Sequence, residues 1–189
     1  SFKNIFSENS RALSSFGSFL LLLALFVIGA PEVMTKINLH RSVFTMLPII
    51  IFMVIPLVFV VTAGEIDLSF ASTFGFAAWV FAILMKLGLD PLLCIFAGLI
   101  SGIFVGMLMG CLVVFGKISS LVASLGALFL IRGFLFVVSD SKSITVIEIR
   151  DHWIYEVLVG QFYGFPLQIF WAIIFVIFSY FLYNKHVFG

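Results

Sequence analysis

The chain has 189 residues, of which 63% are hydrophobic and only 10% are charged. An average soluble domain carries about 25% charged residues, so this composition excludes an ordinary water-soluble protein and indicates several membrane-spanning segments. The net charge of +1, with no long acidic or basic block, excludes nucleic acid as an expected partner.

A helix needs about 20 apolar residues to cross a hydrocarbon core about 30 Å thick. Six windows of about this size follow one another along the chain, and they are continuously apolar rather than alternating, which argues against a membrane β-barrel. The predicted spans are residues 12–31, 42–64, 68–85, 91–116, 118–139 and 166–184. We therefore predict an all-α fold, a polytopic transmembrane helical bundle of about six spans that forms one domain over residues 1–189.

The connections between the spans are short turns, with one exception. In "KLGLDP" (86–91) the proline suits the first position of a helix, and in "GKISS" (116–120) a glycine ends one helix and a serine caps the next. The exception is the outer segment, residues 140–165, which is rich in charge and contains Trp153 and Tyr155. We expect it to lie in water or at the membrane interface, with its aromatic rings at headgroup level.

The fourth span contains a glycine at every fourth position. These residues are Gly98, Gly102, Gly106 and Gly110 in "GLISGIFVGMLMG". Small residues at this spacing give a helix a smooth face that another helix can approach closely. We predict a helix-packing role for all four glycines, with the neighbouring helix in this chain or in a partner subunit.

The fifth span contains one charged residue, Arg132. An arginine at the centre of a membrane helix costs about 2.5 to 3.5 kcal/mol, and less near an end from which its side chain reaches the headgroups. Arg132 is about 10 Å from the predicted end of its span at Ser139. Three roles therefore remain open, namely contact with the headgroups, an ion pair, and contact with a permeating solute.

The stretch "VTAGEIDLSF" (61–70) interrupts the apolar run between the second and third spans. It holds five small or polar residues: Thr62, Gly64, Glu65, Asp67 and Ser69. Gly64 is suited to ending one helix and Asp67 to capping the next, so one interpretation is a turn at the membrane surface. The other is a discontinuous helix whose free backbone groups and acids line a solute cavity. A cap leaves Glu65 unexplained, and we consider Arg132 a candidate partner for it.

The sequence contains no motif for catalysis or for binding a cofactor. It has no GxxxxGK[ST] phosphate loop, and its three histidines lie in connections rather than in a cluster. Cys94 and Cys111 lie in one apolar span without metal or redox spacing. We therefore expect no catalytic residue, no metal and no cofactor in this chain.

Four blocks of sequence together resemble a known family of membrane proteins. They are "VTAGEIDLSFAS", "GLISGIFVGMLMGCLVVFGK", "SSLVASLGALFLIRG" and "YNKHVFG", and they extend over about residues 40–189. Their order and spacing are similar to those of the permease subunit of bacterial ABC importers for simple sugars, the ribose-type family. The chain departs from the family pattern at Phe70, where a small residue is usual, and at Glu65, which only part of the family has.

The resemblance implies a multi-pass subunit of the bacterial cytoplasmic (inner) membrane that forms the path for a simple sugar or related small polar solute. It implies three protein partners besides membrane lipid: a second permease subunit, a cytoplasmic ATP-binding subunit, and an extracytoplasmic solute-binding protein. It also implies that the N-terminus is inside and that residues 140–165 face the binding protein. Because family members continue well beyond "HVFG", we expect the sequence to be an N-terminal fragment of a longer chain.

Two other functions remain open from the residues alone. One is half of an ion-coupled secondary transporter, in which Glu65 or Asp67 is the coupling acid. The other is a membrane scaffold that presents the outer segment and transports nothing. The scaffold interpretation predicts that Glu65 and Arg132 can be replaced without loss of uptake.

Overall fold

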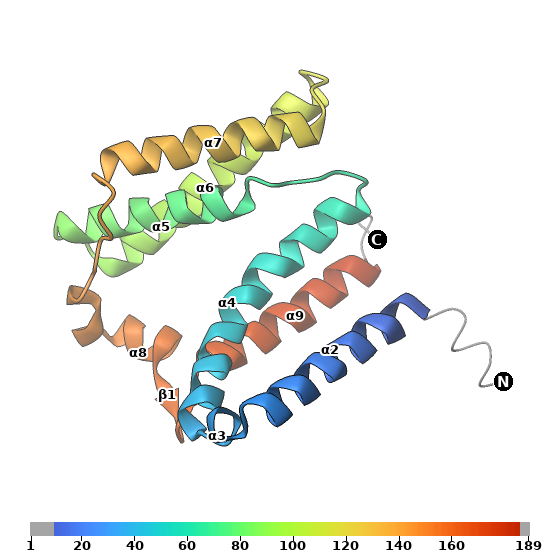
Figure 1. Ribbon diagram of the computed structural model, residues 1–189. Coiled ribbons are helices and arrows are strands. Elements are labelled where there is room, and N and C mark those ends of the chain that lie inside the picture. Colours follow the sequence, from blue (N-terminus) through green and yellow to red (C-terminus); the bar gives the residue numbers. More distant parts are fainter. Residues whose placement is uncertain (1–9, 186–189) are drawn as a thin grey trace. The chain divides into compact units, whose positions relative to one another are not determined.

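The computed structural model describes residues 10–185, so the last four residues of the "YNKHVFG" block lie outside the described part (Figure 1). The chain divides into two compact units, Ser1–Phe44 and Thr45–Gly189. The first unit contains α2 (Ser10–Gly29), α3 (Pro31–Met34) and the start of α4 (Ile37–Thr62). Pro31 begins α3 because its missing amide hydrogen is not needed at the first helical position.

The second unit contains the rest of α4 and all later elements. These are α5 (Phe70–Lys86), α6 (Pro91–Val114), α7 (Ser120–Val138), η1 (Glu148–Asp151), α8 (Trp153–Val159), β1 (Gln161–Phe162), β2 (Phe165–Pro166) and α9 (Gln168–Lys185). The predicted all-α fold is confirmed, since the strands amount to one short hairpin. Among the described residues, α4, α6 and α7 are long and apolar enough to cross a membrane, and α2, α5 and α9 are shorter apolar helices.

The turn between α5 and α6 follows the sequence closely. Gly88 takes a positive φ of 80° after α5, where a residue with a Cβ is strained. The Asp90 carboxylate then accepts a hydrogen bond of 2.8 Å from the amide of Leu92, and Pro91 occupies the first turn of α6. At the next turn α6 ends just before Gly116 and Ser119 is the N-cap residue of α7, as predicted, but Ser119 makes no side-chain hydrogen bond to the helix, and the positive φ is at Lys117.

Helices α5, α6 and α7 pack together within the second unit (Figure 1). Helices α5 and α6 approach each other closely at Gly98, where a Cβ atom would lie 3.0 Å from the carbonyl oxygen of Ala77. Helix α7 meets α5 through aromatic rings, with Phe134 edge-on to Trp79 at a centroid distance of 5.7 Å. Two further ring pairs, Phe52 with Phe175 and Phe59 with Tyr183, join α4 to α9.

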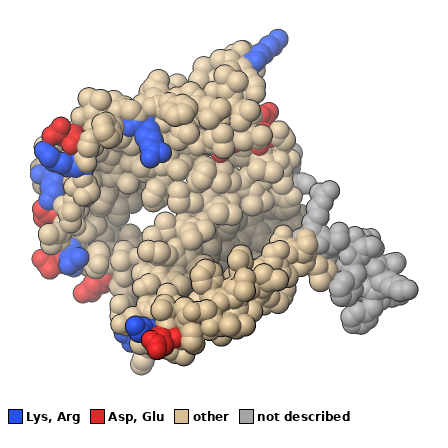
Figure 2. All heavy atoms as spheres, in the orientation of Figure 1, with Lys and Arg blue, Asp and Glu red and all other residues tan. Residues whose placement is uncertain are grey.

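The outer segment is folded and is attached at both ends. The indole nitrogen of Trp171 at the start of α9 donates to the carbonyl of Val157 in α8 at 2.9 Å. At the other end Lys86, the last residue of α5, donates to Glu148 at 2.7 Å. Figure 2 shows charged side chains gathered at the edge of the molecule where α5 ends, beside a broad face without charge. The longest helix of the outer segment is α8, at Trp153–Val159.

Replacing Gly98 by alanine should destabilise the α5–α6 contact by about 1 kcal/mol, because the new methyl group meets a backbone oxygen that cannot move aside easily. The free energy of unfolding is measurable by thermal or denaturant unfolding of the purified protein in detergent. Gly106→Ala on the same helix is the matched control, since its Cβ meets no atom within 4 Å. Equal stability of the two variants would contradict the assigned contact.

The attachment of the outer segment at Glu148 should depend on pH. The hydrogen bond from Lys86 lowers the pKa of Glu148 below its ordinary value. A carboxylate of this kind contributes stability above the ordinary pKa of about 4.3, and the contribution is lost as the pH falls through the lowered value. Both side chains are about half exposed, at 42% and 55%, so the effect on global stability is small.

A nitroxide label at residue 145 should therefore become more mobile in the wild type as the pH falls below the ordinary pKa of a glutamate. In Glu148→Gln the label should already be mobile at neutral pH, whereas the control Asp151→Asn should leave it unchanged. An identical pH profile in wild type and Glu148→Gln would show that another group holds the segment.

Candidate functional site

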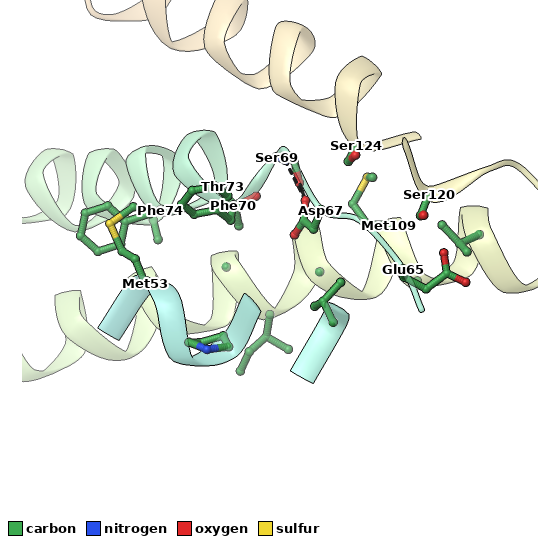
Figure 3. A pocket seen from close by; sticks show the side chains of 18 of the residues that line it. Met53, Glu65, Asp67, Ser69, Phe70, Thr73, Phe74, Met109, Ser120 and Ser124 are labelled. Carbon is green, nitrogen blue, oxygen red and sulfur yellow. Dashed lines mark hydrogen bonds between the residues drawn. The ribbon is translucent and has the colours of Figure 1, made fainter. Parts of the chain in front are cut away.

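A cavity of about 770 Å³ lies among α4, α5, α6 and α7 in the second unit (Figure 3). Most of its wall is apolar, with glycines, aliphatic side chains, methionines and phenylalanines. Its polar residues are contributed by the chain between α4 and α5, by the first turn of α5 and by the first two turns of α7: Glu65, Asp67, Ser69, Thr73, Ser120 and Ser124. The cavity is therefore apolar with one polar end.

Helix α4 ends at Thr62, and two backbone hydrogen bonds to its last turn close the chain around Gly64. Gly64 has a positive φ of 83°. Its amide donates to the carbonyl of Val61 at 3.0 Å, and the amide of Glu65 donates to the carbonyl of Val60 at 3.1 Å. This is the Schellman arrangement, which satisfies carbonyls that would otherwise be free at a helix end. The role of Gly64 as a helix stop, predicted from the sequence, is thus seen directly.

Residues 65–69, called the break segment below, run without helical structure from this stop to the start of α5. Asp67 holds the end of the segment, because its Oδ1 accepts from the amide of Ser69 at 2.7 Å and from its hydroxyl at 2.6 Å. A carboxylate bonded to the amide two residues on forms an Asx turn. Asp67 therefore fixes the residue before α5, rather than capping the first amides of the helix as predicted.

Helix α7 holds the middle of the break segment. The amide of Ile66 donates to the hydroxyl oxygen of Ser120 at 3.2 Å. The hydroxyl of Ser124 donates to the carbonyl of Ile66 at 3.4 Å and is shared with the carbonyl of Leu121 at 3.3 Å. Both serines point toward the segment in Figure 3. The break is therefore level with the first two turns of α7, at one end of the bundle.

The glycine row of α6 divides between two environments. Gly98 and Gly102 lie against Ala77 of α5, because a Cβ atom added at Gly98 would lie 3.0 Å from the Ala77 carbonyl oxygen and one added at Gly102 would lie 3.8 Å from the Ala77 Cβ. A Cβ at Gly106 or Gly110 would meet no atom within 4 Å, and all four glycines line the cavity. Packing against a helix of this chain is thus seen only for the first two. The other two widen the cavity next to its polar end.

The structure does not bring Glu65 and Arg132 together. Glu65 is exposed beside Ser120 at the start of α7, whereas Arg132 lies twelve residues further along that helix, about 18 Å away. Within the described residues no ion pair joins them, and Arg132 does not line the cavity. The suggested pairing is therefore wrong for this chain. Glu65 instead borders the cavity and a second hollow of about 610 Å³ that also contacts Lys117.

The remaining residue of the interrupted stretch, Thr62, lies in the last turn of α4. Its hydroxyl donates to the carbonyl of Phe59 at 2.9 Å, so it serves its own helix and does not line the cavity. The cavity thus includes Glu65, Asp67 and Ser69 but neither Thr62 nor Gly64.

Sequence reasoning missed several contributors to the site, among them Ser120, Ser124 and Pro56. Ser120 and Ser124 are one helical turn apart at the start of an apolar span, a spacing that marks one polar helix face. Pro56 lies within α4 and lines the cavity, and it cannot donate to the carbonyl of Phe52, another lining residue. Both signals are visible in the sequence, as hydroxyls and a proline inside apolar windows.

The site offers hydroxyls and carboxylates at one end of an apolar space. Among the described residues no three His, Cys, Asp or Glu side chains are placed to hold a metal ion. What the arrangement provides is a cavity whose hydrogen-bonding groups converge at one end, the usual form of a small-molecule site.

The chain is similar to known permeases over most of its length. The family described as branched-chain amino acid transport system / permease component matches residues 40–189. The L-arabinose ABC transporter permease protein AraH of Azospirillum brasilense is 30% identical over 172 residues, 90% of this chain and 49% of that protein. The autoinducer 2 import system permease protein LsrD of Escherichia coli (strain K12) is 33% identical over 94 residues, 50% of this chain and 28% of that protein.

No solved structure matches the chain significantly. The chain spans about half the length of the first of these relatives, 49%, and less of the second. Both relatives are permeases, and the described helices include several that are apolar enough for a bilayer, so this is a multi-pass protein of the inner membrane. By its match over residues 40–189, the chain belongs to the family of branched-chain amino acid transport system permease components, with sugar-importer permeases among its relatives.

Proposed function

We propose that this chain supplies part of the translocation path of an ATP-driven importer, and that the cavity between α4 and α7 receives a simple sugar or a related small polar solute. The observation that carries the proposal is the cavity itself, in which an interrupted helix delivers polar side chains to one end of an apolar space. Broken helices serve this purpose in other membrane transporters, because unwound backbone is tolerated where it lines a cavity.

The chemistry of the lining favours an uncharged, hydroxyl-bearing solute over an amino acid. Carboxylates and hydroxyl oxygens accept hydrogen bonds from sugar hydroxyls, and the serine and threonine hydroxyls also donate. No lysine, arginine or histidine is found among the described lining residues, so nothing there offers a positive side chain to an amino acid's carboxylate. The relatives named for L-arabinose and autoinducer 2 import support the same choice over the amino acid in the family description.

The proposal assigns no enzymatic step to this chain. Energy comes from a cytoplasmic ATP-binding subunit, and solute comes from an extracytoplasmic binding protein. A second permease subunit, the same or different, completes the path. With 26 residues, α4 measures about 39 Å, more than the membrane core, so the break segment lies toward the cytoplasmic face if the N-terminus is inside.

Uptake should require ATP hydrolysis by the partner subunit. We expect cells with the full-length permease and a hydrolysis-deficient ATP-binding subunit to lose sugar uptake, measured with a panel of radiolabelled pentoses and hexoses. Uptake that persists in this variant but collapses when the proton or sodium gradient is dissipated would replace the proposal by ion coupling through Glu65 or Asp67.

Filling the cavity should block uptake without unfolding the protein. Gly106→Leu places a side chain into the open space beside the polar end, and we expect uptake to fall about tenfold or more, as for other misfits in a binding pocket. Gly126→Leu on α7 is the matched control, since its Cβ also has no neighbour within 4 Å but the residue does not line the cavity. Membrane abundance of both variants is checked by immunoblot. Normal uptake by Gly106→Leu would exclude this cavity from the path.

A further inference from the structure

The break segment leaves the helical hydrogen-bond pattern, and α7 compensates for this at one residue. At Ile66 both backbone groups are bonded to α7, the amide to Ser120 and the carbonyl to Ser124. The two hydroxyls are four residues apart, so they lie one above the other on the same face of the helix. Ser120 accepts from the amide of Ile66 and Ser124 donates to its carbonyl, so the two hydroxyls together pair both backbone groups of this residue.

The contact between Ser124 and Ile66 is long, and the Ser124 hydroxyl has a second acceptor in its own helix. Ser124 is nearly inaccessible, with 1% of its surface exposed, and its hydroxyl lies at 3.3 Å from its own helix at Leu121 as well as 3.4 Å from Ile66. If Ile66 moves away, this hydroxyl keeps a partner in the carbonyl of Leu121. On the side of α7 the contact therefore opens without leaving the Ser124 hydroxyl unsatisfied.

The break segment carries Glu65, Asp67 and Ser69 into the cavity, so whatever holds Ile66 also sets where these groups lie. We propose that Ser120 and Ser124 are positioning residues for transport: by holding the backbone of Ile66 they fix the polar end of the cavity and couple it to movements of α7. This inference rests on the proposed function, because it assigns the cavity's polar end to the solute path.

The experiment uses the full-length permease assembled with its ATP-binding subunit in nanodiscs. Hydrogen exchange of a peptide covering Ile66 is measured for wild type, Ser120→Ala, Ser124→Ala, the double variant and Ser120→Thr. Loss of one hydrogen bond should accelerate exchange of the Ile66 amide about fivefold in Ser120→Ala, and the threonine variant, which keeps the hydroxyl, should restore protection. The control is Ser139→Ala, whose hydroxyl bonds only the Leu135 carbonyl of the same helix at 2.7 Å.

The same variants are then assayed for uptake of the sugar that the wild type takes up. We expect the double alanine variant to show a several-fold higher KM at unchanged abundance and thermal stability, because the solute groups are misplaced rather than the fold weakened. Ser120→Thr and Ser139→Ala should keep the wild-type KM. A merely structural role of the serines would instead lower stability and abundance and leave KM as it is.

The outcomes separate this inference from the proposed function. Unchanged exchange at Ile66 in Ser120→Ala overturns the inference even if ATP-dependent uptake is normal. Faster exchange with an unchanged KM also overturns it, because the contact then has no part in solute handling. If the wild type shows no ATP-dependent uptake with any sugar tested, the proposed function fails and the inference fails with it, whatever the exchange rates are.

Discussion

A chain that leaves a helix beside an apolar bundle has to find partners for its backbone amides and carbonyls, because an unpaired group costs several kcal/mol in lipid. The rest of the second unit depends on how the backbone groups between α4 and α5 find such partners. The backbone bonds around Gly64 close α4, Asp67 closes the approach to α5, and two serines of α7 meet Ile66 between them. The polar residues of the cavity are thus, for the most part, those that stabilise the break.

The glycine row of α6 shows how one pattern serves two purposes. Where a neighbour is present, at Gly98, the missing side chain allows the backbone of α5 to approach within contact distance. Where no neighbour is present, at Gly106 and Gly110, the same absence leaves open space next to the break segment. One glycine repeat therefore provides both the helix contact and part of the cavity. The position of α5 along α6 decides which glycines pack and which leave open space.

Much of this architecture follows from the sequence. The six apolar windows correspond to helices, the positions of Gly64, Asp90 and Pro91 give the helix ends near them, and the outer segment stands apart by its charge. One helix boundary differs from the predicted one: α5 begins at Phe70 rather than at 68, because Asp67 bonds the amide of Ser69 in an Asx turn and keeps the preceding residues out of the helix. The sequence did not indicate that Lys117 takes a positive φ in the turn between α6 and α7.

By itself the sequence determined the helices, the break and the family, because hydrophobic windows, turn residues and motif order are properties of neighbouring residues. Only the tertiary structure decided which distant groups meet. It separated Glu65 from Arg132 by most of α7, joined Ile66 to Ser120 and Ser124, and divided the glycine row between helix contact and cavity. These pairings depend on the rotation and offset of whole helices against one another, and no short stretch of sequence records either.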